Sequence, residues 1–258
     1  MSLNMKSDLP LTHGSRLFRN RAKAIRECIS WNDPDFIGMQ EFRDFMAEDL
    51  SDISGRYVFY GAGRMKDHKD PRNERCCICW KKDRFELVEG STFWLSHTPD
   101  VPGSKLHESI YPRIATLAIL KDRKTGEVFT LCNTHLDHLL NVTRFRQAGI
   151  LIEELEKRAQ GSFLIVTGDF NATGASPAVR RILSEEHRYH IKDAVPITLG
   201  TTMHDFIASS AHRYRPIDHI FISDNVSIQK TEIISSLYMG VYPSDHCPVL
   251  VILDSPQH

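Results

Sequence analysis

The feature that most constrains this chain is a series of short apolar runs, each bordered by a side chain that can carry charge or a proton. These side chains are Glu41, His135, Asp169, Asp218 and His246. Short apolar runs bounded by turn-forming residues are typical of buried strands. Because functional groups lie mostly on loops at the ends of such elements, we expect the five side chains to meet at one edge of the fold.

The remaining pattern predicts many strands and a few helices. Strands are expected at residues 1–7, 36–40, 56–60, 76–80, 85–89, 114–120, 128–135, 163–170, 219–223, 227–234 and 248–253. Helical spacing predicts a short helix after Pro177 and longer helices over 19–31, 41–50 (opened by Glu41) and 143–159. We expect 76–80 to pair with 85–89, and 91–105 to form an irregular connection. The strands at 114–120 and 128–135 should form a hairpin.

No break in composition divides the 258 residues, so we expect a single domain over residues 1–258. Strands that alternate between hairpins and crossovers favour an α/β sandwich, with sheets in the middle and helices outside. The chain has 32 basic and 33 acidic residues and a net charge of -1. Strong non-specific nucleic-acid binders carry a basic excess, so this balance disfavours a processive nuclease.

Six cysteines are present, three of them within the apolar sequence CCICW (76–80). No second pair of cysteines or histidines stands at zinc-ligand spacing, which favours reduced, buried thiols over a metal site or a disulfide framework. No signal peptide or membrane-spanning run is evident, so we expect a cytoplasmic protein that does not act at a membrane. We expect it to be a monomer.

Each bordering side chain has a functional and a purely structural interpretation. Asp169 and Asn171 in TGDFN could orient a water and hold a phosphate oxygen, or they could simply form a turn. His246 in SDHCPV could take a proton near neutral pH, and a buried Asp218 could fix the tautomer of a histidine. Glu41 could bind Mg²⁺ or only favour a helix N-terminus. Their joint occurrence favours the functional interpretation.

The motifs MQEF, NTHLDH, TGDFNA and SDHCPV, in this order, resemble those of the endonuclease/exonuclease/phosphatase superfamily. The resemblance runs from LNMK to SDHCPV, and FWLSHTPDVPGSK followed by YPRIAT is similar to a bacterial group related to the deadenylase and nocturnin branch. It implies the DNase I-like fold, a four-layer α/β sandwich of two mostly antiparallel or mixed sheets flanked by helices. It also implies metal-dependent hydrolysis of phosphate esters by an activated water.

The resemblance also implies roles for individual residues. Glu41 corresponds to the metal ligand of the family, with Asn4 and Asp245 near the same Mg²⁺ or Mn²⁺ ion. The implied catalytic residues are His135, its partner Glu74, the pair Asp169 and Asn171, Asp218 and the second histidine, His246. Substrate contacts are implied for Arg113, near the scissile phosphate, and for Asn171, His135 and His204. Which of Asp169 and His246 takes the proton stays open.

The substrate class is also open at this point. A nucleic acid, a nucleotide or another small phosphorylated molecule would each suit the implied site. The alternatives are a phosphomonoesterase for a small sugar or nucleotide phosphate, and an inactive binding module on the same fold. We expect Trp94 to be a packing residue, and Arg144 with Gln147 to tie their helix to the NTHLDH loop. The 63–74 segment is best interpreted as a solvated loop, although its basic groups could also steer an anionic substrate; these are Arg64, Lys66, His68, Lys69 and Arg72.

Overall fold

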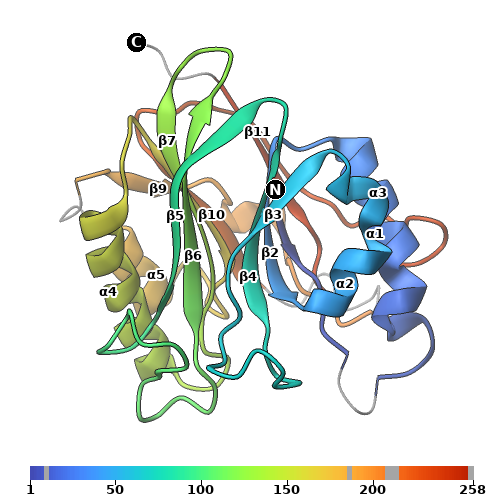
Figure 1. The fold of residues 1–258 in the computed structure, drawn as a ribbon, viewed down its shortest axis with the longest axis horizontal. Helices are drawn as coiled ribbons and strands as arrows, with labels where there is room; N and C mark the ends of the chain where they lie inside the picture. Colours follow the sequence, from blue (N-terminus) through green and yellow to red (C-terminus); the bar gives the residue numbers. More distant parts are fainter. Residues whose placement is uncertain (9–11, 185–187, 207–214, 255–258) are drawn as a thin grey trace.

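In the computed structural model, which describes residues 1–8, 12–184, 188–206 and 215–254, two six-stranded sheets stack face to face (Figure 1). The first sheet has the strand order β11-β12-β1-β2-β4-β3. Its strands are β1 (Ser2–Asn4), β2 (Phe36–Phe42), β3 (Tyr57–Tyr60), β4 (Arg75–Lys81), β11 (Ile228–Ile233) and β12 (Val249–Leu253). Strands β1 and β2 are parallel, and the other pairs in this sheet are antiparallel.

The second sheet has the order β5-β6-β7-β8-β10-β9. Its strands are β5 (Phe85–Trp94), β6 (Ile114–Asp122), β7 (Val128–His135), β8 (Leu164–Asp169), β9 (Ile191–Asp193) and β10 (Asp218–Ser223). Among the neighbouring strand pairs of this sheet, within the described residues, only β7 and β8 are parallel. The expected combination of two mixed, mostly antiparallel sheets is therefore confirmed.

Helices cover the outer face of each sheet (Figure 1). The helices α1 (Phe18–Asn32), α2 (Asp44–Asp49) and α3 (Ser51–Ser54) lie beside the first sheet, and α4 (Asn141–Arg158) and α5 (Pro177–Ile182) beside the second. Short 3₁₀ turns occur at Gly14–Arg16 (η1) and Ile197–Leu199 (η2). No described helix is long and apolar enough to cross a membrane.

Three apolar cores hold these layers together. One lies between the second sheet and α4 and α5, one between the first sheet and α1 to α3, and one between the two sheets. The middle core also contains polar groups, in which Asn133 donates to the carbonyl oxygens of Met39 and Cys77 at 2.9 Å each. Gln40 donates to Asn133 Oδ1 at 2.7 Å, so hydrogen bonds as well as apolar contacts fix how the sheets face each other.

Several local predictions are corrected by the structure. The 76–80 strand does not pair with 85–89, because β4 lies between β2 and β3 while β5 pairs with β6 in the other sheet. Strand β5 also continues to Trp94, into a segment that was expected to be irregular. Apolar patterns identify strands but not their partners, since pairing depends on long-range packing. The 114–120 and 128–135 hairpin is confirmed.

The predicted helix over 41–50 begins later than expected. Glu41 belongs to β2, and α2 begins at Asp44. The pairing of β2 with β4 shifts register between Met39 and Phe42, and Glu41 has a left-handed φ of 54°. Such a bulge redirects a side chain at the end of a strand, and here the redirected side chain is a carboxylate. The six cysteines are free and buried, as expected.

Candidate active site

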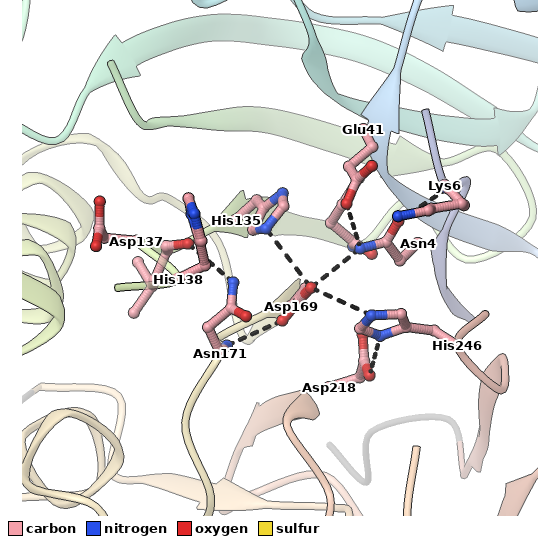
Figure 2. Close-up of polar contacts among 12 residues, drawn as sticks. Asn4, Lys6, Glu41, His135, Asp137, His138, Asp169, Asn171, Asp218 and His246 are labelled. Carbon is pink, nitrogen blue, oxygen red and sulfur yellow. Dashed lines mark hydrogen bonds and ion pairs between the residues drawn. The ribbon is translucent and has the colours of Figure 1, made fainter. Parts of the chain in front are cut away.

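Strands from both sheets end at the same edge of the sandwich and bring polar side chains together (Figure 2). The first sheet contributes Asn4 at the end of β1 and Glu41 near the end of β2. The second sheet contributes the remaining strand-end groups, which are His135 of β7, Asp169 of β8 and Asp218 of β10. His246 lies three residues before β12. In the structure these residues converge as predicted.

The sheet register explains why Asp169 lies at the centre of the cluster. His135 is its direct neighbour on β7, and Asp218 is its direct neighbour on β10. Across the gap between the sheets, Asn4 Nδ2 donates to Asp169 Oδ2 at 3.0 Å. The other carboxylate oxygen accepts from the backbone N–H of Asn171 at 2.9 Å. One carboxylate thus links three strands from two sheets.

His246 approaches Asp169 from the side opposite His135 (Figure 2). Its Nδ1 lies 2.8 Å from Asp218 Oδ2, and its Nε2 lies 3.9 Å from Asp169 Oδ2. All three side chains are buried. Because Nδ1 donates to Asp218, the ring is held in one orientation with Nε2 directed at Asp169.

The cluster strongly perturbs the pKa values of its members. Burial and the neighbouring Asp218 carboxylate raise the pKa of Asp169 to about 7. Burial opposes the charging of His246, but the carboxylates of Asp218 and Asp169 outweigh it and raise the pKa of His246 well above its usual value. Near neutral pH, Asp169 and His246 can therefore exchange a proton with a bound water, and their titrations are coupled.

His135 has the opposite behaviour. Burial, together with the positive charges of Arg113 and Arg64, lowers its pKa well below the usual value. A neutral imidazole at this position can donate one hydrogen bond without adding charge. Its Nε2 lies 3.5 Å from Asp169 Oδ2.

Glu41 is held in a pose that leaves oxygen atoms at the mouth of the cluster. Its Oε1 accepts from Asn4 Nδ2 at 3.1 Å, and its Oε2 accepts from the backbone N–H of Ser7 at 2.8 Å. A carboxylate beside an amide and further carboxylates is the oxygen-rich donor set that suits Mg²⁺ or Mn²⁺. The residues present therefore fit a hard divalent cation.

Asp245 also lies at this mouth, but Lys6 is its direct partner. Lys6 Nζ is 3.3 Å from Asp245 Oδ2, and the carboxylates of Asp245 and Glu41 outweigh burial and raise the pKa of Lys6. The ammonium group thus pairs with Asp245 and also interacts electrostatically with Glu41, and both carboxylates were predicted to lie at the cation. A divalent ion bound there has to compete with Lys6 or displace it.

Within the described part of the chain, the carboxylate and imidazole groups close enough to share an ion are Asp169, Asp218 and His246, whose ligand atoms lie within 4.8 Å of one another. This trio differs from the predicted ligands. We interpret it as a proton-transfer chain, because Nδ1 of His246 already bonds Asp218 and because Mg²⁺ prefers oxygen to imidazole nitrogen.

The predicted partnership of Glu74 with His135 is not what the structure has. Glu74 Oε2 lies 2.7 Å from Arg64 Nη1, and His135 faces Asp169 instead. A guanidinium is permanently charged and attracts a half-buried carboxylate far more strongly than a neutral imidazole does. Glu74 and His135 still line the same small pocket, together with Arg113.

The other predicted contact residues lie around the cluster. Arg113 is buried, and its Nη2 contacts His138 Nδ1 at 3.0 Å. Asn171 Nδ2 donates to the carbonyl oxygen of Leu136 at 3.1 Å, so its amide is fixed beside His135. His204 packs on the ring of Tyr242, with centroids 4.3 Å apart. The backbone N–H of His204 also donates to the carbonyl of Asp245, which places this histidine at the edge of the site.

The two supporting predictions are confirmed. Gln147 Oε1 accepts from the backbone N–H of Asp137 at 2.8 Å, and Arg144 Nη1 donates to the carbonyl of Asp137 at 2.9 Å. Helix α4 is therefore tied to the NTHLDH loop. Trp94 is buried and donates from Nε1 to the carbonyl of Arg64 at 2.7 Å, as a packing residue should.

Lys6 was not identified from the sequence, and Arg64 was named only as one of several loop cations that could steer an anionic substrate. Lys6 follows Asn4 by two residues, so its position just after a strand was an available signal. Arg64 was assigned to a solvated loop, but only 6% of its surface is exposed. Arg64 follows the end of β3 by four residues, at the same edge as the cluster. That position could have indicated a site residue, but the polar composition of the segment suggested a solvated loop instead.

Comparisons with known proteins agree with this geometry. Residues 1–246 match the sequence model described as Endonuclease/Exonuclease/phosphatase family. The solved endonuclease/exonuclease/phosphatase from Bacteroides vulgatus is 31% identical with a TM-score of 0.87, over 98% of this chain and 97% of that chain. The mannosyl-6-phosphatase of Bacteroides thetaiotaomicron is 28% identical with a TM-score of 0.86, over 98% of each chain.

A curated relative is matched over part of its length. The CCR4-Not complex 3'-5'-exoribonuclease subunit Ccr4 of Mycosarcoma maydis is 24% identical over 210 residues. The match covers 74% of this chain and 30% of that relative, so this chain corresponds to less than a third of the larger protein. Together with the family match, these similarities confirm the fold class and the resemblance noted from the motifs.

Proposed function

Because the chain belongs to the Endonuclease/Exonuclease/phosphatase family and is a phosphoric ester hydrolase, we propose that it depends on Mg²⁺ or Mn²⁺ held by Glu41, with Asn4 and Asp245 beside it. When bound, the cation supplies Lewis-acid polarisation of a phosphoryl oxygen. The oxygen-rich donors around Glu41 support this assignment. The family match supports the reaction class.

The observation that carries the mechanism is the chain of contacts from Asp218 through His246 to Asp169. Asp218 holds the His246 ring, and the ring holds a proton close to Asp169. A water placed against Asp169 and His246 can therefore lose its proton as its oxygen attacks phosphorus. Asp169, with a pKa of about 7, is matched to this transfer near neutral pH.

Side chains on the far side of Asp169 stabilise the phosphoryl group. His135 is neutral and donates a hydrogen bond, Asn171 orients the water or a phosphoryl oxygen, and Arg113 supplies positive charge. His204 contacts the substrate from the Asp245 side. Phosphoryl transfer is catalysed mainly by positioning and electrostatics, so each of these groups contributes without reacting itself.

A substrate panel tests this proposal. Phosphate monoesters, phosphate diesters and short oligonucleotides are assayed with Mg²⁺, with Mn²⁺ and with EDTA. We expect metal-dependent release of product that EDTA abolishes. His246→Asn should reduce kcat by about 10²–10⁴-fold, the range for losing a group that takes part in general acid–base catalysis. His190→Asn, an exposed histidine at the far end of the β9 and β10 pair, should retain full activity. Equal rates for the two variants would contradict the proposal.

A further inference from the structure

Two arginines lie buried beside the catalytic cluster, on elements far apart in the sequence. Arg64 and Arg113 have 6% and 5% of their surfaces exposed. Arg64 is held by Glu74 at 2.7 Å, by the carbonyl of Arg72 at 2.9 Å and by the ring of Tyr111, whose centroid is 4.9 Å from the guanidinium carbon. Such fixed guanidinium groups are pre-organised to pair with two oxygens of a carboxylate or phosphate.

Neither guanidinium has all of its donors satisfied. Nε of Arg113 is buried without a partner, and its Nη2 bonds only the neutral ring of His138. Among the described residues, Nη2 of Arg64 and Nη1 of Arg113 have no hydrogen-bond partner. Of these donors, Nε of Arg113 is the buried one, and a buried charged donor is costly unless an acceptor satisfies it, so this arrangement favours an anionic acceptor.

The charges of the pocket lead to the same conclusion. Arg64, Arg113, Glu41, Glu74 and His135 line it together. Glu74 neutralises Arg64, and Glu41 is the carboxylate that we assign to the divalent cation. Arg75 also lines the pocket and is paired with Asp44. One full positive charge then remains, that of Arg113. Both arginines already depress the pKa of His135, after burial itself, so their field reaches the reacting centre.

The pocket is also narrow. Its remaining walls are Arg75, Cys76, Pro112 and Ile114, and the open space inside is about 10 Å³. That volume corresponds to about one water molecule. An unesterified phosphoryl oxygen fits such a space, whereas an alcohol chain esterified to that oxygen does not.

We propose that Arg64 and Arg113 hold the unesterified oxygens of a phosphate monoester, and that the narrow pocket between them excludes phosphate diesters. This proposal rests on the proposed function and specifies its substrate class. Water oxygen bonds to phosphorus while the bond from phosphorus to the alcohol oxygen breaks. Asp169 accepts the water proton while His246 keeps its own, the alcohol oxygen takes up one proton from solvent, and the products are an alcohol and inorganic phosphate.

A matched substrate pair tests the proposal directly. We use 4-nitrophenyl phosphate and methyl 4-nitrophenyl phosphate, which share a leaving group and differ by one methyl ester. With Mg²⁺ and then Mn²⁺, we expect kcat/KM to favour the monoester by at least about 100-fold, because the diester both loses a charged contact and clashes with the pocket. A diester hydrolysed as fast as the monoester overturns this proposal and leaves the proposed function intact. No metal-dependent hydrolysis of either overturns both.

Variants of the arginines give the second arm. Arg64→Gln and Arg113→Gln should each lower monoester kcat/KM by about 10–100-fold, as expected for one charged hydrogen bond, and lower it by more than they lower diester kcat/KM. Inorganic phosphate should inhibit these variants less strongly. Arg123→Gln is the matched control, since Arg123 pairs with exposed Glu86 at the other end of the sheet.

Arg64→Gln leaves Glu74 without its partner, which could impair folding. The double variant Arg64→Gln/Glu74→Gln removes both charges of the pair and keeps the measurement interpretable. We expect it to fold and to lose monoester preference as the single variant does. Equal losses on both substrates in a folded variant, or an unchanged monoester rate, overturn the proposal.

Discussion

Replacing Asp169 by asparagine should make the protein more stable at alkaline pH and inactive at the same time. The pKa of this carboxyl is about 7 in the fold, against an ordinary value of 3.8. Because the folded pKa is raised, the favourable contribution of this group is complete below about pH 4 and is lost as pH rises toward 7. At pH 8 the ionised carboxylate costs about 4 kcal/mol, the free energy that corresponds to this interval.

The amide removes that cost but adds a smaller one. With its oxygen toward Asn4, the new amide nitrogen faces the backbone N–H of Asn171, which now donates to Asp169 Oδ1. An unsatisfied buried donor costs about 1–3 kcal/mol. We therefore expect Asp169→Asn to be about 1–3 kcal/mol more stable than wild type at pH 8, and less stable than wild type near pH 4.

Urea unfolding in EDTA at pH 4 and pH 8 measures this difference without interference from a bound cation. Asp122→Asn provides a control of opposite sign. Hydrogen bonds from Arg84 and the 124–125 backbone outweigh burial and lower the pKa of Asp122, so its loss should destabilise the fold at pH 8. Turnover of Asp169→Asn should fall by about 10²–10⁴-fold. Wild-type stability that is constant from pH 4 to 8, or an Asp169→Asn protein that keeps its activity, would refute the reasoning.

Three further perturbations test other parts of the structure. A methyl group at Gly38 would overlap the polar groups that join the two sheets, so Gly38→Ala should cost about 1–3 kcal/mol in urea unfolding, whereas Gly174→Ala, in open space, should cost little. Burial disfavours charging His219, but its 2.7 Å bond to Asp193 outweighs this and raises its pKa. The charged His219 stabilises the fold fully below about pH 6.5, and this contribution is lost as pH rises through the folded pKa. The difference in unfolding free energy between wild type and His219→Gln should therefore narrow between pH 6 and 9. A difference that does not change with pH would contradict this. Lys6→Met removes the ammonium that competes for the metal carboxylates, and calorimetry should detect Mg²⁺ binding about tenfold tighter, while unchanged affinity would argue against the assigned cation position.

The sequence by itself determined the elements and much of the site. Apolar runs located nearly all the strands, because a buried strand needs apolar residues whichever strand it pairs with. The residues bordering those runs are the ones that converge around Asp169. Motif order identified the family. Arg144 and Gln147 were also placed correctly, because their contacts with Asp137 join neighbouring segments, and Trp94 was placed correctly because a large aromatic side chain favours burial.

Only the tertiary structure decided which strands pair and which charges meet. Strand β4 pairs with β2 rather than with β5, and Glu41 lies in a bulge of β2 rather than in the predicted helix. Both outcomes depend on packing between segments that are distant in the sequence. Glu74 forms an ion pair with Arg64 instead of contacting His135, and Arg64 is buried. Residue type alone predicts that a charged side chain is exposed to solvent. Whether it is exposed or buried in a pocket depends on which other parts of the chain pack around it.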